Sequence, residues 1–414
     1  MTLDMDFVES QFPALQPRDY VYFDNAGGSL VLARVARRIQ EYLFTSSVQH
    51  GATYSKSRIA MERLYEAQES VAQLVNARRP EEIVMGQSTS ALLRTLSSTL
   101  GSRLIPGDEI IVSEAEHEAN AGAWLLLEKQ GVNIRFWPVD KDTMELSTQT
   151  LAGLINARTK LVCVTHVSNI LGTINPVREF ADIVHEHGAK ICVDAVAYAP
   201  HRLIDVQEFD ADYYVFSFYK AYGPHYAALI GRYDDLLELP GTNHGFVAED
   251  DIPYKFQPGN VNYELSYGCI GISEYLVELA HRHGAEGLSG RDALAHAFDV
   301  IAAQEQKLSV RLLDYLNSVP GVTIIGDARD DAAIRVPTIS FSVAGQDSRA
   351  IVEQVDPFDI GIRYGDFYAV RLIEALGLKP QNGVVRVSML HYNSLAEVDR
   401  LIERLDSVLN RNAA

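Results

Sequence analysis

The stretch KICVDAVAYAPHRLIDVQEFDADYYVFSFYKAYGPH, residues 190–225, contains two short apolar runs that are each followed at once by a charged side chain. Asp194 closes the first run and Lys220 follows the second. Short apolar runs bounded by turn residues are typical of strands buried on both faces, as in parallel sheets. Ligands of such sheets bind at the carboxyl ends of the strands. The stretch therefore predicts an α/β fold with Asp194 and Lys220 at the ligand-binding edge.

The same pattern extends to both sides of this stretch. Between about residues 22 and 230, short apolar runs alternate with amphipathic helical stretches, and Pro and Gly occupy the joints. This alternation predicts a mostly parallel, seven-stranded sheet covered by helices on both faces. The expected strands are residues 82–85, 109–112, 133–137, 161–166, 190–193, 213–216 and 227–231.

The pattern changes after Gly259, where two long helical stretches are followed by short strands that alternate with helices. We expect this C-terminal part to form a second, smaller domain of α+β type. The expected segments are an N-terminal segment that packs on the small domain (1–20), a large domain that carries the ligand-binding edge (21–262), connecting helices (263–318) and the small C-terminal domain (319–414).

The composition of the 414 residues excludes several classes of protein. A net charge of -19 argues against binding to nucleic acid or to anionic membranes, which requires clustered Lys and Arg. The three cysteines form no CxxC pair, which argues against a disulfide framework or a zinc or other metal site. The acidic N-terminus does not resemble a secretory signal, and no apolar stretch is long enough to span a bilayer. We therefore expect a cytoplasmic protein.

Lys220 and Asp194 together indicate a cofactor. Apolar and aromatic neighbours partly desolvate a lysine at this position, which lowers the pKa of its ammonium group and frees the amine as a nucleophile. Pyridoxal phosphate needs a lysine that forms a Schiff base and an acid that keeps the pyridine nitrogen protonated. Taken singly, Lys220 is as well explained as a surface lysine and Asp194 as a strand-end cap.

Three further polar groups follow other predicted strands. GQSTSALLRTL, residues 86–96, places the hydroxyls of Ser88 and Thr89 at the start of a helix, where an anion or an ordinary N-cap is expected. His117 in SEAEHEAN is able to stack on a planar ring, and Asn169 in VSNILGTINP to bond a phenolic oxygen. Polar groups at the ends of five strands converge on one crevice, and this conjunction favours pyridoxal phosphate.

The ordered set of motifs resembles the class V aminotransferases, and within them the cysteine desulfurase and selenocysteine lyase group. The likeness runs from YVYFDNAGG, residues 20–28, to HYNSLAEVDRL, residues 391–401. It implies a fold-type I pyridoxal-phosphate-dependent transferase that forms a homodimer with shared active sites. The implied roles are Lys220 for the Schiff base, Asp194 for the pyridinium, His117 for ring stacking, Asn169 for the 3-hydroxyl, Thr89 and Ser217 for the phosphate, and Asn262 for the phosphate of the partner subunit. Ser88 at the helix start and Tyr219 beside the lysine are further candidates for the phosphate.

The resemblance also implies a substrate side. Arg386 in VVRVSML matches the arginine that clamps the α-carboxylate of an amino acid, a task suited to a planar guanidinium fork. Arg363 in IRYGDFYA matches a second active-site arginine. For both, a surface ion pair is the ordinary alternative. Asn25 and Ala26 in FDNAGG are expected to line the same side.

The sequence departs from the desulfurase pattern at three positions. Tyr368 stands where desulfurases carry the cysteine that becomes a persulfide, and a phenol has no such chemistry. Ala197 stands in place of a glutamine near the 3-hydroxyl, and Tyr219 in place of a histidine beside the lysine. A sulfur-mobilising desulfurase is therefore not expected.

The remaining chemistry centres on Lys220 as a base that removes the α-proton of a small amino acid. We favour β-elimination, as in a C–S lyase. Asp366, Tyr368 and His225 are candidates for setting side-chain specificity, and ordinary loop residues are the equal alternative. A class V aminotransferase and an amino-acid epimerase are the alternatives within the family. A catalytically silent scaffold with the same fold is the alternative outside enzymes.

Overall fold

The structure is a computed structural model, and it describes residues 3–16 and 19–409. A seven-stranded sheet in the order β2-β8-β7-β6-β5-β3-β4 forms its centre. All neighbouring pairs from β7 to β4 are parallel, whereas β8 runs antiparallel to both of its neighbours. The predicted mostly parallel α/β sheet is confirmed. Its strands are β2 (Ile83–Gly86), β3 (Glu109–Ser113), β4 (Asn133–Trp137), β5 (Thr159–Thr165), β6 (Lys190–Asp194), β7 (Tyr213–Ser217) and β8 (Ala227–Gly231).

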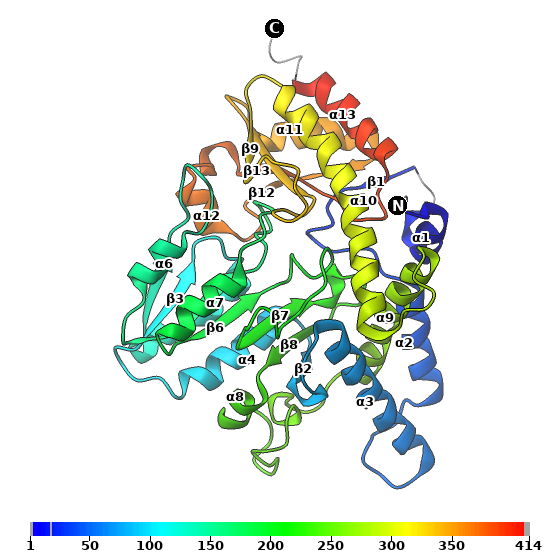
Figure 1. Ribbon diagram of the computed structural model, residues 1–414, viewed down its shortest axis with the longest axis vertical. Coiled ribbons are helices and arrows are strands. Elements are labelled where there is room, and N and C mark those ends of the chain that lie inside the picture. Colours follow the sequence, from blue (N-terminus) through cyan, green and yellow to red (C-terminus); the bar gives the residue numbers. More distant parts are fainter. Residues whose placement is uncertain (1–2, 17–18, 410–414) are drawn as a thin grey trace.

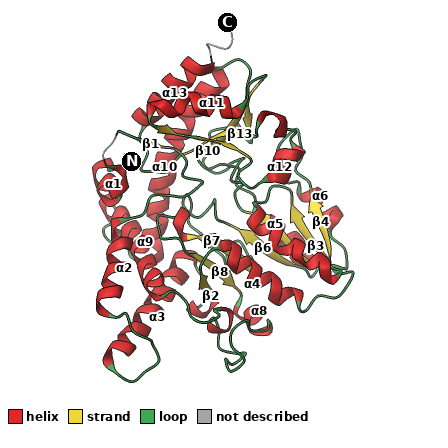
Figure 2. Cartoon of the chain, turned by 180° about the vertical axis from the view of Figure 1, so that it is seen from behind, coloured by secondary structure: helices red, strands yellow, loops and turns green. Residues whose placement is uncertain are grey.

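Helices cover both faces of this sheet because its strands are apolar on both sides (Figures 1 and 2). Successive strand residues point to opposite faces, so Ile191 and Val193 belong to one buried cluster and Cys192 to another. The helices that pack on the first face are α3 (Ser55–Val75), α7 (Val177–Glu186) and α9 (Tyr263–Arg282), and those on the second are α4 (Thr89–Gly101), α5 (Glu118–Leu125) and α8 (Tyr233–Glu238).

A second, antiparallel sheet in the order β12-β13-β10-β9 forms the smaller C-terminal part. Its apolar face packs on helices to form a separate buried cluster. The elements are β9 (Val322–Ile325), β10 (Thr338–Val343), β12 (Arg363–Gly365), β13 (Val384–Ser388), α11 (Ser348–Val355), α12 (Val370–Ala375) and α13 (Leu395–Leu409). The expected smaller domain is thus present.

Helix α10 (Gly290–Ser318) connects the two parts and runs between them in Figure 1. Ala293 and Ile301 near its start belong to the cluster under the large sheet, whereas Leu308 and Leu316 belong to the C-terminal cluster. One continuous helix therefore contributes side chains to both cores.

The N-terminal residues contact both parts. The ring of Phe12, which follows α1 (Met5–Gln11), lies 5.7 Å from Tyr275 of α9 and 4.7 Å from Tyr392. Strand β1 (Val21–Tyr22) pairs in parallel with β11 (Ile360–Gly361), and helix α2 (Ala33–Thr45) then packs on α9. The division into four segments, 1–20, 21–262, 263–318 and 319–414, stays a prediction. Its outermost residues, 1–2 and 410–414, lie outside the described residues.

No helix in the described ranges combines the length and the apolar character that crossing a membrane requires. Helix α6 (Thr148–Leu154) lies between β4 and β5 along the chain.

Candidate active site

Strands β5, β6 and β7 end side by side at one edge of the large sheet. The register pairs Thr165 with Asp194, and β7 runs on to Ser217. A cavity with about 510 Å³ of empty space, part of it open to solvent, lies beyond these strand ends. We call it the inner cavity. Its lining includes Ser88, Thr89, His117, Asn169, Asp194, Ala197, Ser217, Tyr219 and Lys220.

Lys220 lies in a single 3-10 turn, Phe218–Lys220, that follows β7 directly. The side chain is buried, and Nζ makes no hydrogen bond or ion pair to any residue in the described ranges. Burial lowers the pKa of Lys220 to about 8; the charge of Arg386 acts in the same direction, whereas Asp194 opposes it. A buried amine of lowered pKa and without a partner is available as a nucleophile.

Asp194 ends β6 and faces the same cavity. Its Oδ1 accepts a hydrogen bond from the backbone N–H of Val196 at 2.9 Å. Burial raises the pKa of Asp194 to about 6, against the effects of the Val196 N–H and of Lys220. A carboxylate held in this way stabilises a cation that comes to lie beside it.

A pair of hydroxyls marks one end of the inner cavity. Thr89 Oγ1 and Ser217 Oγ are 2.6 Å apart, at the start of α4 and the end of β7. Ser88 is the N-cap of α4, since its Oγ accepts from the Ala91 N–H at 3.2 Å. Hydroxyls beside the free N–H groups of a helix start form a site for a phosphate.

His117 lies between β3 and α5, as the N-cap of that helix. Its Nδ1 accepts from the backbone N–H of Ala119 at 3.0 Å. Burial lowers the pKa of His117 to about 4, and the charges of Lys220 and Arg386 add to this effect. The ring is therefore neutral at pH 7 with its proton on Nε2, a suitable form for stacking on a flat ligand.

Asn169 lines the inner cavity, but its amide is already engaged. Nδ2 donates to the backbone oxygen of Phe367 at 2.9 Å and so holds the loop that follows β12. In this loop Phe367 and Tyr368 have φ angles of 49° and 62°, in the left-handed region that costs L-residues about 1–2 kcal/mol each. The loop is therefore fixed by its contacts above the cavity.

A second cavity of about 400 Å³, the substrate cavity, adjoins the inner one and shares Lys220, His117, Asn169 and Tyr219 with it. The expected Ala26, Arg363 and Arg386 line it, together with Phe367 and Tyr368. All of these residues thus face one continuous space.

Arg386 is buried within β13, and burial lowers its pKa to about 10. Nη2 donates to Asp24 Oδ1 at 2.8 Å and Nη1 to the backbone oxygen of Asn169 at 3.2 Å. Nε is buried, and no described residue accepts its N–H. A buried guanidinium with a free donor beside a cavity is suited to an incoming carboxylate.

Two acidic residues of the site were not expected. Asp24 lies between Arg386 and Arg363, whose Nη1 is 3.4 Å from Asp24 Oδ2. Glu116 accepts from the Ser113 hydroxyl, the Asn120 amide and the Thr165 N–H, and burial raises its pKa to about 8. Glu116 therefore joins the ends of β3 and β5 through hydrogen bonds that it accepts. Their positions in FDNAGG and SEAEHEAN, just after apolar runs, were the only sequence signals.

Two expected residues lie outside both cavities. Asn25 donates to the backbone oxygen of Ser388 at 2.8 Å and to Asn393 Oδ1 at 3.2 Å, so its side chain joins the N-terminal strand to the residues after β13. Asn262 caps α9 by accepting from the Leu265 N–H at 2.8 Å. Neither side chain lines the inner or the substrate cavity.

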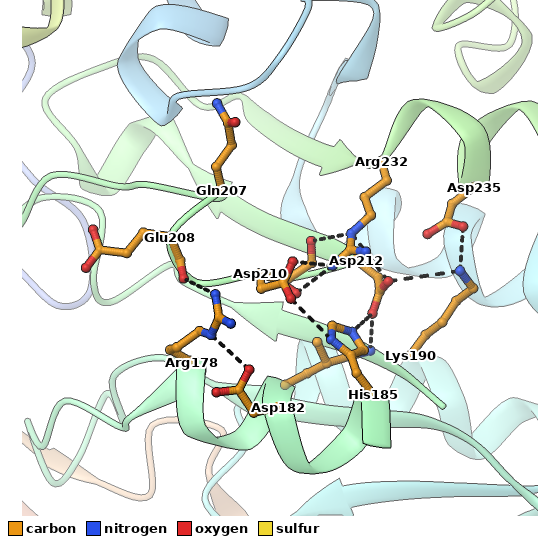
Figure 3. Close-up of polar contacts among 12 residues, drawn as sticks. Arg178, Asp182, His185, Lys190, Gln207, Glu208, Asp210, Asp212, Arg232 and Asp235 are labelled. Carbon is orange, nitrogen blue, oxygen red and sulfur yellow. Dashed lines mark hydrogen bonds and ion pairs between the residues drawn. The ribbon is translucent and has the colours of Figure 1, made fainter. Parts of the chain in front are cut away.

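A second charged cluster lies at the opposite ends of β6 and β7 (Figure 3). Asp212, which precedes β7, accepts from His185 Nε2 at 2.9 Å and from the Ile191 N–H at 2.8 Å. Lys190 at the start of β6 forms an ion pair with Asp235, and Arg232 is 2.8 Å from Asp210. Every charge that we name here has a partner of opposite sign.

Comparison with known proteins places this site in a family. The model of the family described as Aminotransferase class-V matches residues 21–283 and 292–401. The chain belongs to the class V aminotransferase family. Members of this family depend on pyridoxal phosphate, and the chain is a pyridoxal-phosphate-dependent enzyme. The predicted family, cofactor and enzyme class are confirmed.

The class V relatives include fungal and bacterial proteins. The chain is 40% identical to the aminotransferase-like protein FGM3 of Gibberella zeae over 99% of both chains. It is 34% identical to the cysteine desulfurase-like protein ustD of Aspergillus flavus, over 99% of this chain and 92% of that one. Its similarity to a cysteine desulfurase of Serratia proteamaculans is 29% identity over 99% of both.

Solved class V structures confirm the fold-type I architecture. The cysteine desulfurase of Thermococcus onnurineus superposes with a TM-score of 0.86 at 27% identity, over 99% of both chains. The cysteine desulfurase CsdA of Escherichia coli gives a TM-score of 0.84 at 26% identity, over 99% of this chain and 100% of that one.

The residues of the inner cavity fit the cofactor of the family. The unpartnered amine of Lys220 suits its aldehyde, and the buried carboxylate of Asp194 suits a protonated pyridine nitrogen. The Thr89 and Ser217 hydroxyls suit its phosphate, and the neutral ring of His117 suits its flat face.

Proposed function

We propose that this enzyme is a β-lyase that acts on an amino acid with a thiolate or similar leaving group on its β-carbon. Bound pyridoxal phosphate supplies the electron-withdrawing ring that stabilises negative charge at the substrate Cα. Lys220 Nζ would be the attachment point of the cofactor and, when free, the base that receives the Cα proton. The substrate and water together yield a free thiol, pyruvate and ammonium.

The other residues bind and orient the reactants. Asp194 would hold the proton on the pyridine nitrogen and His117 would support the ring. Ser88, Thr89, Ser217 and Tyr219 would hold the phosphate. Arg386 binds the substrate α-carboxylate through a guanidinium whose Nε has no described acceptor. Arg363 lies at the mouth of the substrate cavity and is the more exposed of the two arginines.

The absence of a thiol at the site supports a lyase over a desulfurase. Tyr368 occupies the loop position of the persulfide cysteine, and its ring centre is 5.4 Å from that of His117. All three cysteines of the chain are buried, and none lines the inner or the substrate cavity. The leaving sulfur therefore has no thiolate acceptor on the protein and departs with its electron pair into solvent.

Incubation of the yellow holoenzyme with S-substituted cysteines tests this proposal. We expect thiol, pyruvate and ammonium in equal amounts, measured by mass spectrometry and a coupled pyruvate assay. A 2-oxo acid that keeps its side chain indicates an aminotransferase, and racemised substrate indicates an epimerase. Colourless protein that takes up no cofactor indicates a scaffold. Each of these three outcomes overturns the lyase.

We further propose a homodimer in the cytoplasm. Asn262 and its neighbours line neither the inner cavity nor the substrate cavity of their own chain. If Asn262 contacts the phosphate of a cofactor, that cofactor must therefore be bound in a second subunit. Sedimentation of the holoenzyme tests the dimer, and a monomer with full activity contradicts it.

A further inference from the structure

A third cavity, which we call the outer cavity, adjoins the substrate cavity. It has a volume of about 640 Å³ and shares Gly27, Tyr219 and Arg363 with the substrate cavity. A group attached to a substrate held between Lys220 and Arg386 is thus able to extend past Tyr219 into this space. The proposed reaction itself needs only the inner cavity and the substrate cavity.

One wall of the outer cavity consists of two stacked rings. The centroids of the Tyr219 and His225 rings are 5.2 Å apart, and their planes differ by 13°. Burial raises the pKa of Tyr219, and the charge of Asp194 acts in the same direction, so the phenol is uncharged at neutral pH. Flat aromatic surfaces of this kind favour planar apolar groups over flexible chains.

Gly27 and Gly28 line the outer cavity next to this wall. A Cβ atom added to Gly28 would lie 3.3 Å from Cδ2 of Tyr219, and one added to Gly27 would lie 3.0 Å from Asp24 Oδ2. Either side chain would press on the ring or on the carboxylate. The lack of side chains at these positions therefore lets the backbone pack closely on the Tyr219 ring and the Asp24 carboxylate at the edge of the outer cavity.

The charges of the residues beside the outer cavity indicate whether its ligand is charged or neutral. Two guanidinium groups, Arg386 and Arg363, flank a single carboxylate, Asp24. The α-carboxylate of an amino acid supplies the second negative charge and makes the set neutral. A further charged group in the outer cavity would then find the two charged residues of its lining, Asp24 and Arg363, already engaged with each other, so a neutral group is the better fit.

We infer that the outer cavity is a subsite for a neutral, planar substituent on the β-carbon of the substrate. The substrate class is therefore β-substituted alanines with an aromatic group, such as S-benzyl-L-cysteine, rather than cysteine itself. This inference rests on the proposed β-lyase function. The aromatic group lies against the rings of Tyr219 and His225. The atoms that link it to the β-carbon pass Gly27 and Gly28 between the substrate cavity and the outer cavity.

Paired ligands and paired variants test the subsite. The wild-type holoenzyme should bind S-benzyl-L-cysteine about tenfold more tightly than S-methyl-L-cysteine, as read from the change in cofactor absorption. Val31→Trp fills the outer cavity, which Val31 lines, and should remove this preference. His225→Ala, which removes one of the stacked rings, should reduce it.

Leu237→Trp is the matched control. It adds the same indole at a similarly exposed aliphatic position on α8 and should keep the preference of the wild type. Equal affinity of the wild type for the two conjugates, or an unchanged preference in both Val31→Trp and His225→Ala, overturns the subsite. Binding without release of pyruvate overturns the lyase instead, so the two failures are distinguishable.

Discussion

Charged residues at the two ends of strands β6 and β7 differ in whether they form ion pairs. At the carboxyl ends, Asp194 and Lys220 are buried and neither forms an ion pair. At the amino ends, Asp212 bonds His185 and Lys190 pairs with Asp235. The strands are five residues long, so only about 13 Å separates the two sets. Charges that stabilise the fold are paired, whereas charges left unpaired are kept for a ligand.

Replacement of Lys220 should produce the largest effect. Lys220→Ala removes both the attachment point and the base, and turnover should fall by about a thousandfold or more. Borohydride reduction followed by mass spectrometry should find no cofactor bound covalently. Lys190→Ala is the matched control at the other end of the sheet and should retain covalent cofactor. A reducible adduct in Lys220→Ala would refute the assignment.

Arg386→Ala should weaken substrate binding by about 2–5 kcal/mol, because it removes the buried partner of the α-carboxylate. Titration of the holoenzyme with substrate, followed by cofactor absorption, measures this change. Arg386→Lys keeps the charge but loses the planar fork, and should recover only part of the affinity. Unchanged affinity in the alanine variant rules out the clamp.

Asp212→Ala tests the paired end of the same strands. It leaves the buried Ile191 N–H without an acceptor, and should lower the free energy of unfolding by about 1–3 kcal/mol. Denaturant unfolding measures this loss. Turnover at a temperature well below the transition should stay near the wild-type rate. A large loss of turnover without loss of stability would erase the contrast between the two ends.

The smallest expected effect is a pH dependence of stability at the paired end. The hydrogen bond to Asp212 raises the pKa of His185 above 6.5, whereas burial acts in the opposite direction. The pair therefore stabilises the fold fully below pH 6.5, and this stabilisation is lost as the pH rises through the raised pKa of His185. Burial alone would raise the pKa of Asp212, but hydrogen bonds from His185 and Ile191 lower it below 3.8. The contribution therefore disappears again as the pH falls through that lowered value.

Unfolding of the wild type and of His185→Gln at several pH values measures this window. The difference in stability between the two proteins should be greatest between about pH 4 and 6.5 and should shrink on both sides. A difference that does not vary with pH would show that the imidazolium contributes nothing to the pair.

Most of the fold follows from local pattern. Strands β4 and β8 have the predicted bounds, and the expected strand 161–166 is shifted by one or two residues to Thr159–Thr165. The reversed direction of β8 was also readable, because the connection from Ser217 to Ala227 is too short for a parallel crossover. Burial of a continuous apolar run does not depend on distant residues, so the sequence alone predicts it.

The sequence predicts a site residue when that residue comes directly after a strand that places it at the cavity. It does not predict the orientation of a side chain whose hydrogen-bond partners are distant in the sequence. Lys220 and Asp194 face the inner cavity as expected. The orientation of Asn25 depends on Ser388 and Asn393, and the ion pair of Asp24 on Arg386, more than 350 residues away. Such partners are invisible in a local motif, and the hydrogen bonds that they offer determine where a polar side chain points.

Helix α10 has a mechanical consequence. Its 29 residues form a rod about 44 Å long that is anchored in two cores. A hinge between the two parts would have to bend this rod or pull its side chains out of one core, since the helix has no break at which to flex. We therefore expect ligand entry to depend on local changes at the rim of the cavities rather than on a hinge, and the loop at Phe367 and Tyr368 can take part only if the hydrogen bond from Asn169 to Phe367 is broken.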